Sequence, residues 1–520
     1  MMDHLPLLPI LIPLLAAAAM LFVEHGRLGM LPQRAIAWTS LAAMLAVSLL
    51  LLRQADGGSI GVYLLGDWPA RLGIVLVVDR LSALMVLLGQ LLAAACLLHA
   101  CAGRDRRATH FHAFFQFQLM GLNGAFLTGD LFNLFVFFEV LLIASYGLLL
   151  SGGGGARMRA GLHYVAFNIG ASTLFLLALG LLYGLLGTLN MAEMAARVAE
   201  VPAGDLALVE AAAGLLLVVF CAKAALLPMY LWLPQTYTQA PAAVAALFAI
   251  MTKVGLYAVL RVGTLSFGLA GPLAGFAWPA LQGLGAVTLV LAALGVLAAR
   301  RLRMLAAYLV LGSAATLFVA FALAKPGTIA AGLYYLVHST LAGAALFLIA
   351  DLVRQRGRGG AGQDMDTPRM GRMASLLFLL VAVSLAGLPP LSGFIGKLLL
   401  LAAVPAGATG WVWTCVLGSS FLMLVGLART GVHVFWGSDS ASPEANDEAD
   451  EAPPSSPATA SLAAAPLENA AILLLVGYGI ALALAAAPIL AFTRATAEQL
   501  LTPADYIHQV DAALPARRAP

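Results

Sequence analysis

The sequence predicts an all-α membrane protein with about fourteen transmembrane helices. Of its 520 residues, 62% are hydrophobic and 10% are charged, and apolar stretches long enough to cross a bilayer, ~20 residues each, recur along the whole chain. Only helices and closed barrels satisfy their backbone hydrogen bonds inside lipid. Stretches rich in Leu and Ala, without alternation of polar and apolar residues, favour helices.

The apolar stretches give fourteen candidate spans in chain order. They cover about residues 5–24, 34–52, 73–100, 110–129, 131–150, 161–187, 207–227, 241–261, 275–298, 303–323, 328–352, 373–403, 407–430 and 465–492. The first of them lacks the basic region that opens a signal peptide. We therefore expect it to remain as the first spanning helix.

Arginines in short loops orient these spans, because Lys and Arg are enriched on the cytoplasmic side. Most of them fall in loops that follow odd-numbered spans: Arg27, Arg34, Arg104, Arg106, Arg107, Arg157, Arg159, Arg300, Arg301, Arg303, Arg354, Arg356, Arg358, Arg369 and Arg372. The remaining loops carry fewer cations. The pattern predicts a multi-pass protein of the bacterial plasma (inner) membrane with both termini outside.

One connection, residues 437–460, differs from the others in being acidic, rich in Pro, Ser and Ala, and free of large apolar side chains. This composition predicts a disordered cytoplasmic loop. A solvated linker to the last helix is the simpler interpretation, and a docking segment for a partner is the alternative.

Several classes of site are not supported by the sequence. The net charge of +3 is too small to indicate a nucleic-acid partner. Cys96, Cys101, Cys221 and Cys415 lack the spacing of a metal or disulfide motif, and GFIGK does not match a phosphate-binding loop, since Leu398 stands where Ser or Thr is required. We expect no cofactor and no metal.

The lysines are distributed unusually. The chain has four lysines against twenty-four arginines, and three of the four, Lys223, Lys253 and Lys397, lie inside apolar spans. A lysine desolvated by burial can lose its proton near neutral pH, whereas an arginine effectively cannot. The three lysines therefore look like groups that exchange protons.

Two further titratable residues lie in the membrane: Glu139 in LFNLFVFFEVLLIAS and His338 in GLYYLVHSTLAGAALFLI. An intramembrane charge costs at least ~2.5 kcal/mol and usually has a function. One structural ion pair between Glu139 and a lysine would account for only one of the three cations, although His338 alone could be a hydrogen-bonded core residue. The set as a whole favours a proton relay over a purely structural role.

Prolines interrupt two of the lysine-bearing spans. Pro228 follows Lys223 in the seventh span, and Pro389 and Pro390 precede Lys397 in the twelfth. Proline removes a backbone hydrogen bond and breaks or kinks a helix, and matched broken helices in two halves are typical of inverted-repeat transporters. A kink that only shapes packing is the alternative.

These residues resemble the antiporter-like membrane subunits shared by respiratory complex I, membrane-bound hydrogenases and the Mrp/Pha cation/proton antiporters. The resemblance runs from about residue 5 to 435. The stretches GDWPARLGIVLVVDRLSALM and FHAFFQFQLMGLNGAFLTGDLFNLFVFFEVLLIASYGLLL look most like the D subunit of the Mrp/Pha systems, whereas AKAALLPMYLWLPQTYTQAPAAVAALFAIMTKVGLYAVLR and GLPPLSGFIGK are shared with complex I.

The resemblance implies a fourteen-helix fold with two inverted five-helix repeats and broken helices 7 and 12. It divides the chain into 1–109 (helices 1–3), 110–261 (helices 4–8), 275–432 (helices 9–13), the loop 437–460, and 465–492, the last helix, followed by a short outer tail. It also implies a proton-relay role for Glu139, Lys223, Lys253, His338 and Lys397, which we call the relay residues.

The mechanism that follows has Glu139 and Lys223 as a charge pair whose opening releases the lysine proton. Lys253 and His338 would pass the proton toward Lys397. Asp79 and Arg80 form either an internal pair or an interfacial salt bridge.

Three functions remain open from the sequence: a non-enzymatic subunit of a heteromeric Na⁺ or K⁺/H⁺ antiporter, whose partners are the other subunits and membrane lipid; a proton-pumping subunit of an NADH-quinone oxidoreductase or hydrogenase complex; and a self-sufficient solute carrier. We expect the first.

Overall fold

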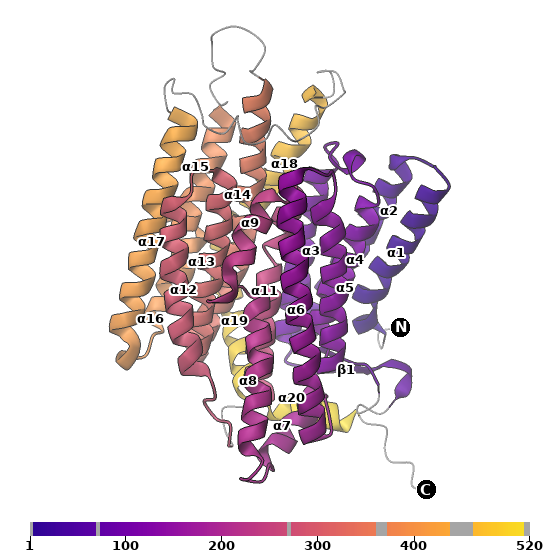
Figure 1. Cartoon of the computed structure of the whole chain (residues 1–520), viewed down its shortest axis with the longest axis vertical. Helices are drawn as coiled ribbons and strands as arrows, with labels where there is room; N and C mark the ends of the chain where they lie inside the picture. The colour runs from indigo at the N-terminus through magenta and orange to yellow at the C-terminus, as the bar shows by residue number, and fades with distance from the viewer. Residues whose placement is uncertain (1–3, 69–72, 268–271, 360–371, 437–460, 514–520) are drawn as a thin grey trace.

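The structure is a computed structural model that describes residues 4–68, 73–267, 272–359, 372–436 and 461–513. Most helices run roughly parallel along the long axis of the molecule (Figure 1). Twelve helices among the described residues are long and apolar enough to cross a membrane. The chain is thus an all-α membrane protein, as the sequence predicts.

The N-terminal part contains three long helices and one hairpin. Its elements are α1 (Leu8–His25), α2 (Met30–Asp56), β1 (Gly61–Leu64), β2 (Val75–Val78) and α3 (Arg80–Ala100). The strands pair antiparallel, from Gly61 opposite Val78 to Leu64 opposite Val75. The helix predicted over 73–100 therefore starts too early: the β-branched run before Asp79 favours a strand, and the Asp79 side chain caps α3 through the backbone N–H of Ser82.

The next part holds the first predicted break. Its helices are α4 (Phe111–Leu127), α5 (Leu131–Leu150), α6 (Gly155–Leu186), α7 (Met191–Ala199), α8 (Leu206–Lys223), α9 (Trp232–Gln239), α10 (Ala242–Phe248) and α11 (Met251–Leu265). Helix α8 ends at Lys223, and the helical path resumes at a short 3₁₀ turn, Met229–Leu231.

The second break lies in the following part of the chain. Its helices are α12 (Trp278–Ala298), α13 (Leu302–Ala322), α14 (Pro326–Gly359), α15 (Arg372–Ala386), α16 (Ser392–Ala402) and α17 (Thr409–Gly431). Gly387, in the left-handed region at φ 80°, ends α15, and the two prolines Pro389 and Pro390 separate it from α16.

The C-terminal part differs from the prediction of a single last helix over 465–492 with a short tail. The structure has α18 (Ser461–Leu484), α19 (Ala486–Leu501) and α20 (Ala504–Ala512). Helix α19 packs on α14, and α20 packs on α7 and β1, at the lower end of the bundle in Figure 1. The acidic segment 437–460, predicted to be disordered, lies outside the described residues.

A buried ion pair ties the N-terminal helices to the centre of the bundle. The guanidinium of Arg261 in α11 donates two hydrogen bonds to the carboxylate of Asp79, at 2.5 and 2.7 Å. The predicted pairing of Asp79 with Arg80, as an internal pair or as an interfacial salt bridge, is wrong, because Arg80 instead donates to the backbone carbonyl of Asp56. The tyrosines Tyr257 and Tyr506 place their rings about the Arg261 guanidinium.

The second break depends on a glycine. A Cβ atom at Gly393 would lie 1.9 Å from the carbonyl oxygen of Ser384 and 2.8 Å from Nε2 of His338. Because backbone cannot yield as a flexible side chain can, only glycine allows α16 to approach the end of α15 and the histidine of α14 this closely.

We predict that Gly393→Ala destabilises the second break by about 1–3 kcal/mol, the usual effect of overpacking. The expected result is a lower midpoint of thermal unfolding of the purified protein. Gly418→Ala in α17 is the matched control, because a Cβ there meets nothing within 4 Å. Equal stability of the two variants would contradict the close approach.

Candidate functional site

Glu139 and Lys223 are connected through a serine. Ser172 in α6 donates a hydrogen bond from its hydroxyl to Oε1 of Glu139 in α5, and its oxygen accepts one from Nζ of Lys223 in α8, at 3.2 Å. Asn168, one turn before Ser172, accepts a second bond from Nζ at 3.2 Å. The described contacts contain no ion pair within 4.0 Å between Glu139 and Lys223. The serine hydroxyl stands between the two charges.

The first break follows directly after Lys223. The backbone N–H of Leu227 donates to Oγ1 of Thr288 in α12, at 3.0 Å, instead of to a helix carbonyl. The indole N–H of Trp232 donates to the carbonyl of Ala222 at 3.1 Å. Side chains therefore satisfy backbone groups that the interruption at Pro228 leaves without helical partners, which irregular backbone in a membrane requires.

Lys253 is completely buried near the start of α11. Its ammonium donates to the hydroxyl of Ser313 in α13 at 2.8 Å. Both residues lie in spans that are almost entirely enclosed by other helices. All of the apolar stretch in Ala242–Leu265 is buried, and 89% of that in Leu302–Ala322. This lysine lies in the core of the bundle and not at its surface.

His338 and Lys397 both lie at the second break. Nδ1 of His338 in α14 is 2.9 Å from the hydroxyl of Ser392, the first residue of α16. Lys397, farther along α16, donates to the carbonyls of Leu385 and Ala386, at 3.3 and 3.0 Å, and to Ser420 in α17, at 3.0 Å. A cation at the end of a helix stabilises the carbonyls that have no helical partner.

The five predicted residues thus share one mode of contact. Each hydrogen bonds to a serine hydroxyl: Ser172 for Glu139 and Lys223, Ser313 for Lys253, Ser392 for His338 and Ser420 for Lys397. A hydroxyl can donate and accept at once, so each serine can hold its partner in either protonation state. The described hydrogen bonds do not join Lys223 to Lys253 or Lys253 to His338 directly.

Sequence reasoning missed these hydroxyl partners. A signal was present, because Asn168 and Ser172 stand one turn apart within an apolar span and Ser313 is a similar isolated polar residue in α13. Such isolated polar residues are common in membrane helices, where they bond to backbone carbonyls. The sequence could not tell which of them would face a charged group.

Comparison with known proteins places the chain in a family. A profile described as NADH:quinone oxidoreductase/Mrp antiporter, TM, matches residues 128–423. The D subunit of a probable K(+)/H(+) antiporter of Rhizobium meliloti (strain 1021) is 40% identical, and the match covers 98% of both chains. The D subunit of the Na(+)/H(+) antiporter of Bacillus subtilis (strain 168) is 36% identical over 86% of this chain and 90% of its own.

Solved structures agree in fold. A chain of the Mrp complex from Dietzia sp. DQ12-45-1b superposes with a TM-score of 0.85 at 27% identity, covering 99% of both chains. A chain of respiratory complex I from Thermus thermophilus superposes with a TM-score of 0.70 at 24% identity, over 96% of this chain and 100% of its own, which shows a shared fold only. The chain therefore belongs to the NADH:quinone oxidoreductase/Mrp antiporter family and, within it, to the D subunits of cation/proton antiporters.

Proposed function

We propose that this chain is the proton-translocating subunit of a heteromeric Na⁺ or K⁺/H⁺ antiporter of the bacterial plasma membrane. The observation that carries the proposal is the chain of five titratable side chains around two helix breaks, each with a hydroxyl partner. Intramembrane ionisable residues mark ion pathways, and broken helices mark the sites where transporters handle ions. The full-length relatives support an antiporter component over a component of an electron-transferring enzyme.

The first transfer step uses the Glu139–Ser172–Lys223 contact. Lys223 in its charged form donates to the Ser172 oxygen, while the same hydroxyl donates to Glu139. A shift of the serine hydrogen toward the carboxylate, with a lysine proton taking its place, moves one proton from Lys223 to Glu139 without either side chain changing position. The reverse exchange reloads the lysine.

The later steps run from the first break to the second. Lys253 would receive the proton through water and pass it to His338, whose partner Ser392 begins the helix that carries Lys397. Lys397 exchanges with the opposite membrane face. The carbonyls of Leu385 and Ala386 accept hydrogen bonds from the charged ammonium of Lys397. A neutral Lys397 stabilises these carbonyls less, so proton release is coupled to the geometry of the second break.

The two breaks also support the inverted-repeat division into 110–261 and 275–432. One break follows α8 in the first half and the other separates α15 from α16 in the second half. Twelve candidate spans are long and apolar enough to cross the membrane among the described residues. Helix α4, with 17 residues, and the broken helix formed by α15 and α16 would add two more, which gives fourteen.

The orientation with both termini outside has structural support. Arg104, Arg303 and Arg354, which the positive-inside pattern assigns to cytoplasmic loops, all contact the carboxylate of Asp351 and therefore lie on one face. The first turn of the chain, Leu5–Leu7, and the last helix α20 both contact β1. The first and last elements that the structure describes therefore share one end of the bundle.

An exposed stripe on α5 supports partner subunits. The stripe consists of three apolar side chains that are 47%, 39% and 61% exposed: Phe132, Val136 and Ile143. Glu139 lies between them on the same helix face and is half-buried. The spacing alternates between four and three residues, which is typical of a helix face that packs against another helix. An acid on a face that lipid would cover is costly. A neighbouring subunit would shield it, with lipid covering the other apolar faces.

Lys223→Arg separates a relay from a structural charge. Arginine keeps the positive charge and can still bond to Ser172 and Asn168, but it cannot release its proton at physiological pH. We expect an assembled complex whose cation-dependent proton movement in inverted membrane vesicles falls by at least about 10², the usual contribution of one proton-transferring group.

Lys325→Arg is the matched control, since Lys325 is an exposed lysine just before α14 and should tolerate the same change. Wild-type amounts of the partner subunits in the purified complex would establish assembly. Retention of most of the exchange by Lys223→Arg would show that Lys223 need not lose its proton, and the proposed relay would be wrong.

Ser172→Ala tests the hydroxyl between the two charges. Removing it leaves Glu139 and Lys223 in place but without their shared partner, so we expect slower exchange, by about tenfold, or about 1.4 kcal/mol in the barrier. Thr173→Ala is the control, because the neighbouring Thr173 is exposed and bonds only to the carbonyl of Ile169. Equal rates in both variants would remove Ser172 from the pathway.

A further inference from the structure

Two matching turns lie side by side at the end of the bundle that carries α7 and α20 (Figure 1). Residues 128–130 precede α5, and residues 188–190 precede α7. Asp130 stands opposite Asn190 in an antiparallel bridge, and the first residue of each helix donates its backbone N–H to a carbonyl of the other turn, at 2.9 Å. We call these segments the paired turns. The proposed orientation puts them on the outer side of the membrane.

The last residue of each paired turn caps the helix that follows it. Oδ1 of Asp130 accepts hydrogen bonds from the backbone N–H groups of Phe132 and Asn133, at 2.8 and 3.0 Å. Oδ1 of Asn190 accepts hydrogen bonds from the second and third residues of α7, at 3.0 and 3.2 Å. Both residue types are preferred N-caps. Because a neutral asparagine makes the same two bonds, capping in this turn does not require a negative charge.

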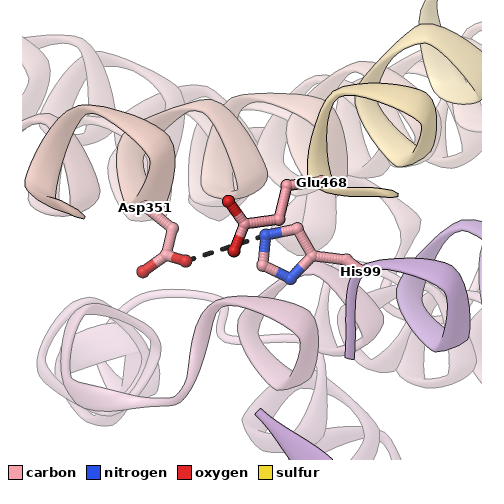
Figure 2. Close-up of side chains that lie close together, drawn as sticks. All are labelled: His99, Asp351 and Glu468. Carbon is pink, nitrogen blue, oxygen red and sulfur yellow. Dashed lines mark ion pairs between the residues drawn. The ribbon is translucent and has the colours of Figure 1, made fainter. Parts of the chain in front are cut away.

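The charge of Asp130 sets it apart from the other buried acids. Five acidic side chains are buried within the described part of the chain: Asp79, Asp105, Asp130, Asp351 and Glu468. The other four lie within 4.0 Å of an arginine. Figure 2 shows two of these, Asp351 and Glu468, beside His99, whose Nε2 is 3.7 Å from the Asp351 carboxylate. Asp130 makes no ion pair with any described residue. Buried charges are usually paired, so a carboxylate that capping does not need indicates a further role.

The elements packed around the paired turns supply no partner cation for Asp130. Their titratable side chains that lie at least partly inside the protein are Asp79, Glu193, Arg197, Tyr257, Arg261 and Tyr506. Arg197 is paired with Glu193 at 3.1 Å, and Arg261 is paired with Asp79. The two tyrosines are uncharged at neutral pH, and strand β2 carries only apolar side chains. Both cations thus have acidic partners of their own.

Asp130 can take up a proton from the outer solution. It is 9% exposed and lies between the helices α4 and α5 and not within either of them. Burial raises the pKa of the Asp130 carboxyl to about 6, although its two capping hydrogen bonds act in the opposite direction. The side chain is therefore charged in a neutral or alkaline medium and neutral in an acidic one.

We propose that Asp130 is a positioning residue for Glu139 and that its charge makes exchange depend on the outer pH. A negative charge at a helix N-terminus stabilises the first turn of the helix, and Glu139 lies about two and a half turns further along α5. A charged Asp130 therefore holds the start of α5, and with it the contact of Glu139 with Ser172. A protonated Asp130 still caps α5, as Asn190 caps α7, but without the charge. The inference rests on the proposed function, because Glu139 is one of the relay residues.

Asp130→Asn tests the charge, because it gives a neutral cap at every pH. Cation-dependent proton movement is measured in right-side-out membrane vesicles with a fixed inner pH. At an outer pH of about 7.5 we expect the variant to be about fivefold slower than the wild type, the effect of one charge at a helix N-terminus. At an outer pH of about 5, where the wild-type side chain is itself neutral, the two rates should be equal. A ratio that stays constant would overturn the inference, because a merely structural residue acts equally at every pH.

Asn190→Ala is the matched control. It removes the cap of α7 but no charge, so its rate relative to the wild type should not change with the outer pH. Asp130→Ser, a second neutral N-cap, should reproduce the behaviour of Asp130→Asn. Wild-type amounts of the partner subunits in the purified complex would establish assembly of each variant. A pH-dependent ratio for Asn190→Ala, or a constant one for Asp130→Ser, would count against the role of the Asp130 charge.

The two proposals fail separately. A constant ratio for Asp130→Asn, in a complex that Lys223→Arg inactivates, would overturn the role of Asp130 and leave the relay standing. A pH-dependent ratio, combined with full exchange by Lys223→Arg, would overturn the relay and leave Asp130 as the group through which the outer pH acts.

Discussion

A charged side chain within the bilayer must find its polar partners inside the protein, and this constraint organises the whole molecule. The acid and the three lysines that the sequence places in apolar helices would each cost several kcal/mol without partners. The fold supplies serine hydroxyls, one asparagine amide and the carbonyls at the end of a broken helix. Because these partners are neutral, they do not hold each side chain in its charged form as strongly as an opposite charge would. A tight ion pair would instead favour the charged form and oppose proton transfer.

The Asp79–Arg261 pair illustrates the other solution to the same constraint. Two parallel hydrogen bonds hold the guanidinium against the carboxylate, and removing one partner of such a buried pair typically costs about 3–5 kcal/mol. Arginine suits this role because it does not release a proton. The two buried cations of α11 thus have different partners. Arg261 forms an ion pair with Asp79 and so connects α11 to the start of α3, whereas Lys253, two turns earlier, donates to the hydroxyl of Ser313.

The sequence predicts the membrane class, most of the helices and the two breaks, because hydrophobic length and proline act locally. It also predicts the burial of Lys223, Lys253 and Lys397, since lysines within apolar stretches have no other place, but not that of Arg261 or Asp351. It does not predict the strand before Asp79, where β-branched residues in an apolar run resemble a buried helix, nor the pairing of Asp79 with Arg261. Long-range contacts such as Ser172 with Glu139, or His99 with Asp351, depend on how helices far apart in the chain pack, and no local pattern encodes that.

The position of the C-terminal helices has a consequence for how the protein is made. Helix α19 packs on α14, and Tyr506 of α20 lies against Arg261, whose partner Asp79 precedes α3. Chains emerge from the ribosome from the N-terminus onward. The Asp79–Arg261 pair is therefore synthesised before α20, whose Tyr506 covers it in the folded protein. A chain that ends before α19 would therefore lack the Tyr506 ring that covers the Arg261 guanidinium of this pair.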